Sequence, residues 1–253
     1  MVDLFYKHIN LLGGVIFKKI KKYPTFLLVN SVFKDTWYNF FVPVTDADNF
    51  DWDLSKKIIK DQRKSGVKLS YYVKDDLNEN YKNKLESMSY SVMGNDTYVY
   101  LKMAKKFETG NIHTEEINNK TMDAYIKTAK SCFPGFSSEE AYCRHFLKIA
   151  KSNVENDILA SNLEVFEDNK FAVFASIYGS KKQNLAYLHN DGTAKEFRRR
   201  GFHSEITKIR CNMAFDLGIN NIYSILEEGK ASYYSYIKLG FKPMVCYYLY
   251  TKG

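Results

Sequence analysis

The stretch EFRRRGFHSEI, residues 196–206, places three consecutive arginines directly before a glycine and then begins a helical pattern. Apolar side chains recur every three or four positions at Ile206, Ile209, Met213 and Leu217. Gly218 follows as a helix stop, so the pattern predicts a helix of about four turns. A strand pattern, NLAYLHNDGTA, precedes the arginines at 184–194. The arginines therefore occupy a strand-to-helix turn, where they could contact nucleic acid, decorate a solvated helix start or flank a loop that holds a phosphate.

The composition restricts the choice of partners. The 253 residues suffice for one large or two ordinary domains without disulfides or metals, and 45% of them are hydrophobic. The net charge of +8 arises from 37 scattered basic residues among 29 acidic ones, which disfavours nucleic acid as a partner. The four cysteines show neither C-x-x-C nor zinc-ligand spacing, which predicts reduced thiols, no metal site and a cytoplasmic location.

The N-terminal segment predicts neither an export signal nor a membrane anchor. Its short apolar run is interrupted by Asp3, Lys7 and His8, and no small-residue cleavage site follows. No stretch of the chain approaches the roughly twenty apolar residues of a membrane helix, so we expect no membrane partner. We interpret the basic cluster FKKIKKY, residues 17–23, as a solvated helix end.

A polar segment without apolar periodicity, residues 105–121, separates two regions that each alternate strand and helix patterns. We therefore predict two domains, residues 1–105 and 106–253. The first region contains strand and helix patterns in alternation, with strands at 25–32, 67–73 and 97–103 and helices at 53–66 and 79–88.

The second region follows the order helix, helix, three strands, turn, helix, strand, helix, strand. Its helices are predicted at 121–131, 137–152, 204–217 and 231–240, the second starting with a capping box of Ser137 and Glu140. Three consecutive strand patterns between 163 and 194 form, in the simplest arrangement, an antiparallel meander. We predict an α/β protein of the α+β type, with a mixed, mostly antiparallel twisted sheet flanked by helices.

The turn at 198–204 meets the physical requirements of an anion site. A glycine at a strand–helix junction leaves backbone amides at the positive end of the helix dipole, where a phosphate is favoured. Gly201 carries no β-carbon, so a ligand can approach the backbone, and the flanking arginines carry forked donors suited to phosphate oxygens. A plain solvated arginine cluster would not need this glycine.

Two segments resemble signatures of the GNAT superfamily of acyl-CoA N-acyltransferases. Residues 198–203, RRRGFH, resemble its motif A, [QR]-x-x-G-x-[GA], and the preceding TAKEF resembles the usual lead-in to that motif. The segment YYSYIKLGFKP, residues 233–243, resembles the second signature, a tyrosine in a helix that ends in Leu-Gly-Phe. The resemblance covers residues 110–253 and implies the GNAT fold for them.

The resemblance also implies a binding site for acetyl-CoA or coenzyme A. Backbone amides from Arg199 to Ser204 would hold the pyrophosphate, and backbone around Thr193 and Ala194 would pair with the pantetheine arm. The implied set of cofactor-binding residues is Thr193, Ala194, Arg198, Arg199, Arg200, Gly201, Phe202, His203, Ser204, Ser232 and Tyr233. His203 stands where the family usually has glycine or alanine, so its side chain is expected to point away from the ligand.

Tyr236 matches the family's usual general acid, because it lies five residues before the phenylalanine of Leu-Gly-Phe. The alternative is a tyrosine that only packs, in a chain with 20 tyrosines. Three residues are candidates for the general base. His189 and Asp191 share one face of a strand unless a bulge at Asp191–Gly192 intervenes, and Glu227 ends the following strand.

The first region is interpreted as a divergent repeat of the second. Residues 72–92 can be aligned with 224–244 with Tyr90 over Phe241 and Met88 over Leu239, although any two α/β segments share such a pattern. Where the first region should carry its cofactor loop it has TDADNFDWD, residues 45–53, whose four aspartates would repel a pyrophosphate. We predict a degenerate GNAT-like domain without a cofactor.

The resemblance implies an acetyl-CoA or acyl-CoA dependent N-acyltransferase that acts on a primary amine of a small molecule or peptide, as a monomer or homodimer. Two alternatives stay open. One is a non-catalytic acyl-CoA sensor. The other is an aminoacyl-tRNA-dependent transferase of related fold, a class that typically lacks the pyrophosphate loop.

Overall fold

The structure, a computed structural model, describes residues 4–133, 139–152 and 157–252, with side chains up to residue 150 in the second range. The chain groups into two compact units. The first comprises Met1–Tyr98, Leu226–Glu228 and Pro243–Gly253, and the second comprises Val99–Ile225 and Gly229–Lys242. Each unit is described separately below.

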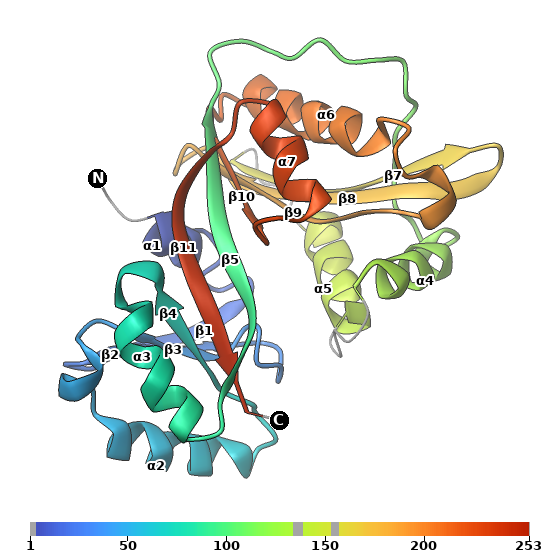
Figure 1. Ribbon diagram of the computed structural model, residues 1–253. Helices are drawn as coiled ribbons and strands as arrows, with labels where there is room; N and C mark the ends of the chain where they lie inside the picture. Colours follow the sequence, from blue (N-terminus) through green and yellow to red (C-terminus); the bar gives the residue numbers. More distant parts are fainter. Residues whose placement is uncertain (1–3, 134–138, 153–156, 253) are drawn as a thin grey trace. The chain divides into compact units, whose positions relative to one another are not determined.

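The first unit contains one part of the sheet together with helices α2 and α3. Its elements are α1 (Leu4–Leu11), β1 (Phe17–Lys22), β2 (Phe26–Ser31), β3 (Phe40–Pro43), the short 3₁₀ helix η1 (Ala47–Asn49), α2 (Trp52–Arg63), β4 (Ser70–Lys74), α3 (Asp75–Ser87), the start of β5 (Ser91–Lys102) and most of β11 (Lys242–Thr251) (Figure 1). Strands β1, β2 and β3 pair antiparallel, and β3 pairs parallel with β4. Because β4 also pairs antiparallel with β11, the end of the chain belongs to the first unit, and the division is not a single cut near residue 105.

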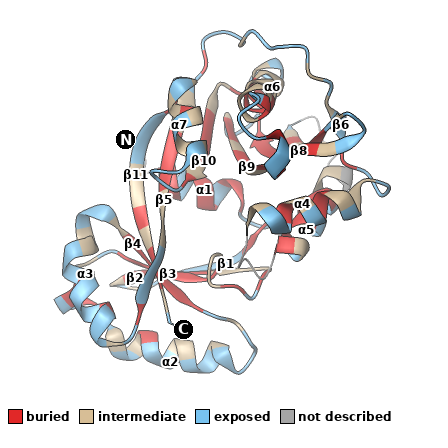
Figure 2. Cartoon of the chain, turned by 45° about the vertical axis from the view of Figure 1, so that its right-hand side comes forward, coloured by how far each residue is buried: buried red, intermediate tan, exposed pale blue. Residues whose placement is uncertain are grey.

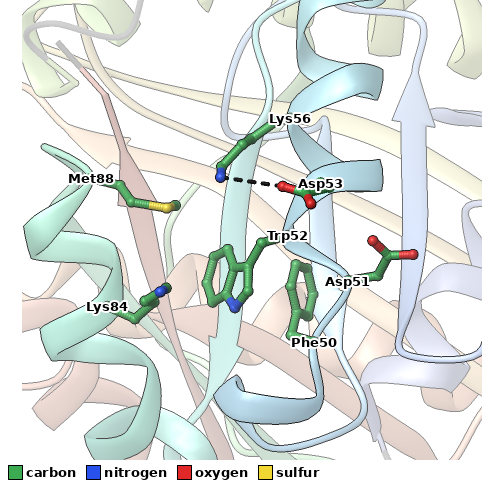
Figure 3. Close-up of a pocket in the computed structure, with 7 residues that line it drawn as sticks. All are labelled: Phe50, Asp51, Trp52, Asp53, Lys56, Lys84 and Met88. Carbon is green, nitrogen blue, oxygen red and sulfur yellow. Dashed lines mark ion pairs between the residues drawn. The ribbon is translucent and has the colours of Figure 1, made fainter.

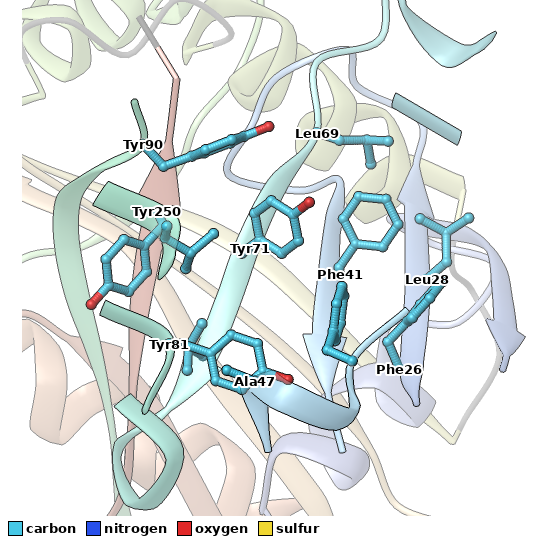
Figure 4. Packing of buried hydrophobic residues seen from close by; sticks show 12 residues of the cluster. Phe26, Leu28, Phe41, Ala47, Leu69, Tyr71, Tyr81, Tyr90 and Tyr250 are labelled. Atoms are coloured by element: carbon cyan, nitrogen blue, oxygen red, sulfur yellow. The ribbon is translucent and has the colours of Figure 1, made fainter. Parts of the chain in front are cut away.

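Aromatic side chains build the core of the first unit. Phe41 and Tyr71 are fully buried and stack with ring centroids 5.2 Å apart, and Tyr81 of α3 packs in the same cluster (Figure 4). The Tyr71 hydroxyl lies 2.9 Å from the Ser55 hydroxyl, and the Tyr81 hydroxyl donates to the Thr45 carbonyl at 2.8 Å. Since both buried hydroxyls have partners, the rings can be buried without the cost of an unsatisfied polar group.

The second unit contains the other part of the sheet, with helices on both faces. Its elements are the end of β5, β6 (Glu115–Glu116), α4 (Met122–Cys132), α5 (Glu139–Ser152), β7 (Ile158–Glu167), β8 (Lys170–Ser180), β9 (Leu185–Thr193), η2 (Lys195–Phe197), α6 (Phe202–Asp216), β10 (Asn221–Leu226) and α7 (Ala231–Lys238). Strands β7, β8 and β9 form the predicted antiparallel meander, β6 pairs antiparallel with β7, and β9 pairs parallel with β10.

Alternate residues of β8 face the two helix layers of the second unit. Val173 and Ala175 pack in one cluster with Ile206 of α6, whereas Phe174 packs in another with Tyr125 of α4. Figure 2 shows the strands largely buried and the outer surfaces of the helices exposed. One face of this sheet is therefore covered by α6 and the other by α4 and α5.

The predicted fold class is confirmed. Among the described residues, eleven strands form a mixed, mostly antiparallel sheet with flanking helices. The interpretation of the FKKIKKY cluster was wrong, because residues 17–22 form β1, whose lysines are exposed at the end of the strand order. Lysines on an edge strand discourage pairing with other chains. The predicted helix cap Ser137 lies outside the described residues.

The two units repeat one order of elements. In the first, β3, η1, α2, β4, α3 and β5 follow one another, and in the second β9, η2, α6, β10, α7 and β11 do so. Helices α3 and α7 end one residue before Met88 and Leu239, and strands β5 and β11 begin one residue after Tyr90 and Phe241. The predicted alignment of the two regions therefore holds element by element, and it places Leu85 of α3 over Tyr236 of α7.

Candidate active site

The turn between β9 and α6 presents consecutive backbone amides without protein partners. Helix α6 begins at Phe202 with no side-chain cap, and the bond that opens it runs from the Glu205 amide to the Gly201 carbonyl at 3.1 Å. Within the described parts of the chain, no protein group accepts a hydrogen bond from the amides of Arg199 to Ser204. These donors at the positive end of a helix are suited to an anion.

Gly201 is required by the backbone of the turn and leaves space beside it. Its φ of +86° lies in the left-handed region, where L side chains are strained. A β-carbon built at this position would meet no atom within 4 Å. The space that a side chain would fill is therefore open to a ligand.

Two of the three arginines hold the turn in place. Arg198 donates from Nε to the Thr193 carbonyl at 3.0 Å, and Arg200 donates to the Glu167 carboxylate at 2.6 Å. The Arg200 guanidinium also lies over the ring of Phe202, 5.2 Å from its centroid. Both side chains stay exposed, so they order the turn and add a positive potential around its amides.

A bulge interrupts β9 shortly before the turn. The register between β8 and β9 shifts between the pairs Phe174–Gly192 and Ser176–His189, and Asn190 has a φ of +47°. The extra residue turns the His189 and Asp191 side chains to opposite faces of the sheet. The two candidate bases therefore do not share one face, and the bulge lies at Asn190, before the predicted Asp191–Gly192.

On the α6 face of the bulge, Asp191 joins two fully buried side chains. Tyr236 Oη donates to Asp191 Oδ2 at 2.7 Å, and Arg210 Nη2 donates to the same oxygen at 2.5 Å. Arg210 Nη2 also lies 3.1 Å from Tyr236 Oη, and Arg210 Nη1 donates to the Ser176 carbonyl at 2.8 Å. Helices α6 and α7 thus fix the tyrosine hydroxyl against an ion pair.

The surroundings shift the pKa values of this cluster in opposite directions. Burial alone would raise the pKa of Asp191, but the charge of Arg210 and the contacts from His203 and Tyr236 outweigh it and hold that pKa well below its usual range. Burial raises the pKa of Tyr236, and the nearby carboxylate adds to this against the opposing effect of Arg210. Asp191 is therefore too weak a base for neutral pH, whereas Tyr236 stays protonated and can donate.

His203 reaches from the first turn of α6 to the same cluster. Its Nε2 lies 3.4 Å from Asp191 Oδ1, and its ring centroid lies 5.9 Å from that of Tyr236. The side chain is 21% exposed, more than that of Asp191 or Arg210. The imidazole points into the unit while the His203 amide remains in the turn.

On the opposite face, the bulge contacts α4 and α5. His189 Nδ1 lies 2.9 Å from the Tyr142 hydroxyl, and its ring stacks on Tyr187 with centroids 4.9 Å apart. Asn190 donates to the Tyr125 hydroxyl and lies 3.7 Å from Cys143 Sγ. His189 is thus enclosed by aromatic side chains, as expected for a structural histidine.

Glu139, the first residue of α5, belongs to the same side of the sheet. It is 2% exposed, and Cys143 Sγ donates to its Oε1 at 3.3 Å. Burial raises the pKa of Glu139 to about 7, against a smaller lowering by the thiol contact. A buried carboxyl that titrates near neutral pH is a candidate for proton transfer.

The remaining predicted site residues lie in varied surroundings. The Ala194 amide donates to the Ala172 carbonyl at 2.9 Å within the sheet, whereas antiparallel alternation turns the Thr193 amide away from β8. Ser232 and Tyr233 lie half-buried in the first turn of α7. Glu227 is exposed and groups with the first unit.

The corresponding helix start in the first unit differs. Asp51 caps α2 by accepting from the Leu54 amide at 3.0 Å, so a carboxylate occupies the position of the amide ligand. The pocket next to it has a volume of about 450 Å³ (Figure 3) and is lined by Phe50, Asp51, Trp52, Asp53, Lys56, Lys84 and Met88. One of the four aspartates expected to repel a pyrophosphate, Asp51, thus caps the start of α2.

Comparisons with known proteins show the fold. Neither family models nor curated protein sequences match the chain. A conserved protein of unknown function from Staphylococcus epidermidis aligns with 94% of this chain and 95% of its own, at 10% identity and a TM-score of 0.69. A GCN5-related N-acetyltransferase from Kribbella flavida aligns with 99% and 95%, at 13% identity and a TM-score of 0.65. The chain has the GNAT fold.

The GNAT fold extends over most of the chain. A tandem GNAT protein from the clavulanic acid biosynthesis pathway covers 90% of this chain and 78% of its own, at 11% identity and a TM-score of 0.55. The predicted resemblance to GNAT proteins is therefore confirmed, including the tandem arrangement as one known form of the fold. Sequence identity at this level concerns the fold alone.

Within this GNAT fold, sequence reasoning missed Arg210 and Glu139. Arg210 lies four residues after Ile206 on the buried face of α6, whereas the predicted face included Leu217, which is 38% exposed. The spacing of four residues between Arg210 and the apolar Ile206 was the sequence signal that could have placed Arg210 on the buried face. Glu139 directly precedes Glu140 at a helix start, where acidic residues are common, so its burial had no sequence signal.

Two predicted absences concern the described residues. No group of three or more histidine, cysteine, aspartate or glutamate side chains there could hold a metal ion. No helix in the described ranges has the length and apolar character to cross a membrane.

Proposed function

We propose that the second unit is an acetyl-CoA dependent N-acyltransferase that acts on a primary amine of a small molecule or peptide. The observation that carries this proposal is the uncapped start of α6, where the amides from Arg199 to Ser204 have no protein acceptor and Gly201 leaves open space. These features fit the pyrophosphate of coenzyme A, whose negative charge would complete the helix start.

When bound, acetyl-CoA supplies an acetyl group activated as a thioester. The chain's own residues would bind it through the turn and hold a proton donor, Tyr236, on the adjoining helix. Arg210 lies 3.1 Å from Tyr236 Oη, so its charge would stabilise the phenolate that forms when this proton leaves. To act as an acid, the Tyr236 hydroxyl would have to release its hydrogen bond to Asp191 Oδ2.

The two alternatives differ from this proposal in measurable ways. A non-catalytic acyl-CoA sensor would bind acetyl-CoA through the same turn without transfer to any amine. An aminoacyl-tRNA-dependent transferase would not need the free amides and the open glycine position of the turn. The free amides favour the acyl-CoA dependent reaction over the tRNA-dependent one.

Substitution of Gly201 tests the proposed cofactor site. Gly201→Asn and Gly201→Asp introduce side chains of nearly equal size that both tolerate a positive φ, so they differ mainly in charge. In calorimetric titrations, wild type should bind one acetyl-CoA per chain, and the aspartate variant should bind at least about tenfold more weakly than the asparagine variant because its charge opposes the pyrophosphate. Equal affinities of the folded variants would place the pyrophosphate elsewhere.

A further inference from the structure

Glu139 is a buried carboxyl group without a described cationic partner. Its neighbour Glu140 pairs with Lys130 of α4 at 2.8 Å and with Arg144 of α5 at 3.0 Å, and these side chains are exposed. Glu139 points inward, and within the described residues its hydrogen-bond partner is the Cys143 thiol. A buried carboxylate is costly unless a positive charge or several donors accompany it.

The groups around Glu139 touch the strand segment that follows the bulge. Cys143 contacts Asn190 of the bulge, and Cys132 Sγ donates to the Thr193 carbonyl at 3.6 Å. Gly192 packs so closely there that a β-carbon would lie 2.9 Å from Cys132 Sγ. Cys143 therefore connects Glu139 to Asn190 of the bulge, on the face opposite Tyr236 and Arg210.

The titratable groups that face Glu139 are neutral at physiological pH. They are Tyr125 and Cys132 of α4 and Cys143 of α5, and burial raises the pKa of each above its ordinary value. On β9, the neighbouring ionised group is Asp191, which faces the other side of the sheet. The described cation in this region is Arg198, which contacts Cys132 and the Thr193 carbonyl, whereas the hydrogen-bond partner described for Glu139 is the Cys143 thiol.

We infer that Glu139 holds the ammonium group of the acceptor and accepts its proton, on the face of β9 opposite the proton donor. This inference rests on the proposed function. A primary amine is protonated at neutral pH and cannot attack until it loses a proton. The Glu139 carboxylate takes one proton from the ammonium ion, which leaves a neutral amine and a carboxylic acid, and the acid returns its proton to water.

The opposite placement of the two groups suits the reaction. The proton donor of the second unit, Tyr236, is a residue of α7, and the proton acceptor, Glu139, is the first residue of α5; these helices contact opposite faces of the bulge in β9. The substrate class that this arrangement selects is a cationic primary amine.

Glu139→Gln tests the inference, with Glu140→Gln as the matched control. Both variants remove one negative charge from adjacent residues, but only Glu139 is buried. The probes are n-butylamine, phenethylamine, putrescine and lysine amide, with acetylated product measured by mass and acetyl-CoA binding by calorimetry. We expect kcat/KM for the best amine to fall about a hundredfold in Glu139→Gln, and less than about twofold in the control.

The pH profile separates a catalytic group from a structural one. In wild type, log kcat/KM should rise between about pH 6 and 8 as Glu139 ionises, and this rise should vanish in Glu139→Gln while acetyl-CoA affinity stays unchanged. A retained rate and profile would overturn the inference. A second outcome would also overturn the inference: wild type binds acetyl-CoA, but neither acetylation nor binding of any probe amine depends on Glu139. If acetyl-CoA itself does not bind, the proposed function fails instead.

Discussion

At the scale of single residues, the tyrosine hydroxyl is the group whose removal is most informative. Tyr236→Phe keeps the buried ring and deletes only the donor to Asp191, while the contact between Arg210 and Asp191 remains. We expect turnover to fall on the order of a hundredfold because a positioned general acid is lost, with acetyl-CoA affinity unchanged. Steady-state kinetics on an amine acetylated by wild type, under conditions where chemistry is rate-limiting, measures this.

The alternative for Tyr236 predicts a different outcome. A hydroxyl that only packs would cost about 1 kcal/mol of stability and leave turnover nearly intact. Urea unfolding of the same variant supplies that comparison. Full activity together with a small loss of stability would show that Tyr236 only packs in the site and that another group donates the proton.

Glu139 also has a consequence for stability. Its pKa is about 7 in the folded unit against 4.5 for the ordinary group, so the folded state binds the proton more tightly than the unfolded chain. Stability from this group is complete below about pH 4.5 and is lost as the pH rises through about 7. Above pH 7, Glu139→Gln should therefore be more stable than wild type, by on the order of 2 kcal/mol.

Unfolding of wild type and variant by urea at pH 5, 6, 7 and 8 measures the difference. The Glu140→Gln control loses exposed ion pairs and should change little across this range. A variant that is inactive yet more stable at pH 8 would indicate that the carboxylate is kept for function. A difference that does not grow with pH would place the pKa of Glu139 near its ordinary value.

At the scale of elements, helices α2 and α6 occupy the same place in the repeated order but begin differently. Helix α2 is capped by the Asp51 carboxylate, whereas α6 begins at Gly201 without any side-chain cap. A side-chain cap accepts a hydrogen bond from an amide at the helix start, whereas the amides of an uncapped start remain available to a ligand. Under the proposed function, the start of α6 would bind an anion, whereas the capped start of α2 would serve structure.

Removal of the cap tests this assignment. Asp51→Ala should cost about 1 kcal/mol of unfolding free energy because the Leu54 amide loses its acceptor. The matched variant Asp53→Ala removes an exposed carboxylate whose pair with Lys56 is 3.5 Å long, and should cost less than about 0.5 kcal/mol. Urea denaturation of both measures the difference. Equal stability of the two would mean that the cap contributes nothing.

At the scale of the whole molecule, the two units should differ in ligand binding. We expect one coenzyme A per chain, because Asp51 and its neighbouring aspartates oppose a pyrophosphate at the start of α2. Leu85 also stands where the second unit has Tyr236, so the first unit lacks the proton donor. Calorimetric stoichiometry measures this, and two equivalent sites per chain would contradict the degenerate character of the first unit.

The sequence by itself determined the order of strands and helices from α4 to β11, the strand-to-helix turn with its arginines and Gly201, and the alignment of the two regions. These features depend on local periodicity and on backbone conformations that particular residues require, both of which are written into neighbouring positions. For the same reason the acidic loop at 45–53 could be distinguished from the basic turn at 198–204 without any coordinates.

Only the tertiary structure decided which side chains meet. The bulge at Asn190 turned His189 and Asp191 to opposite faces, and it depends on pairing between β8 and β9 rather than on residue type. Arg210 and Glu139 became candidates through burial, because desolvation and neighbouring charges set their protonation and both arise from segments distant in sequence. The assignment of the last strand to the first unit likewise required the long-range pairing of β11 with β4.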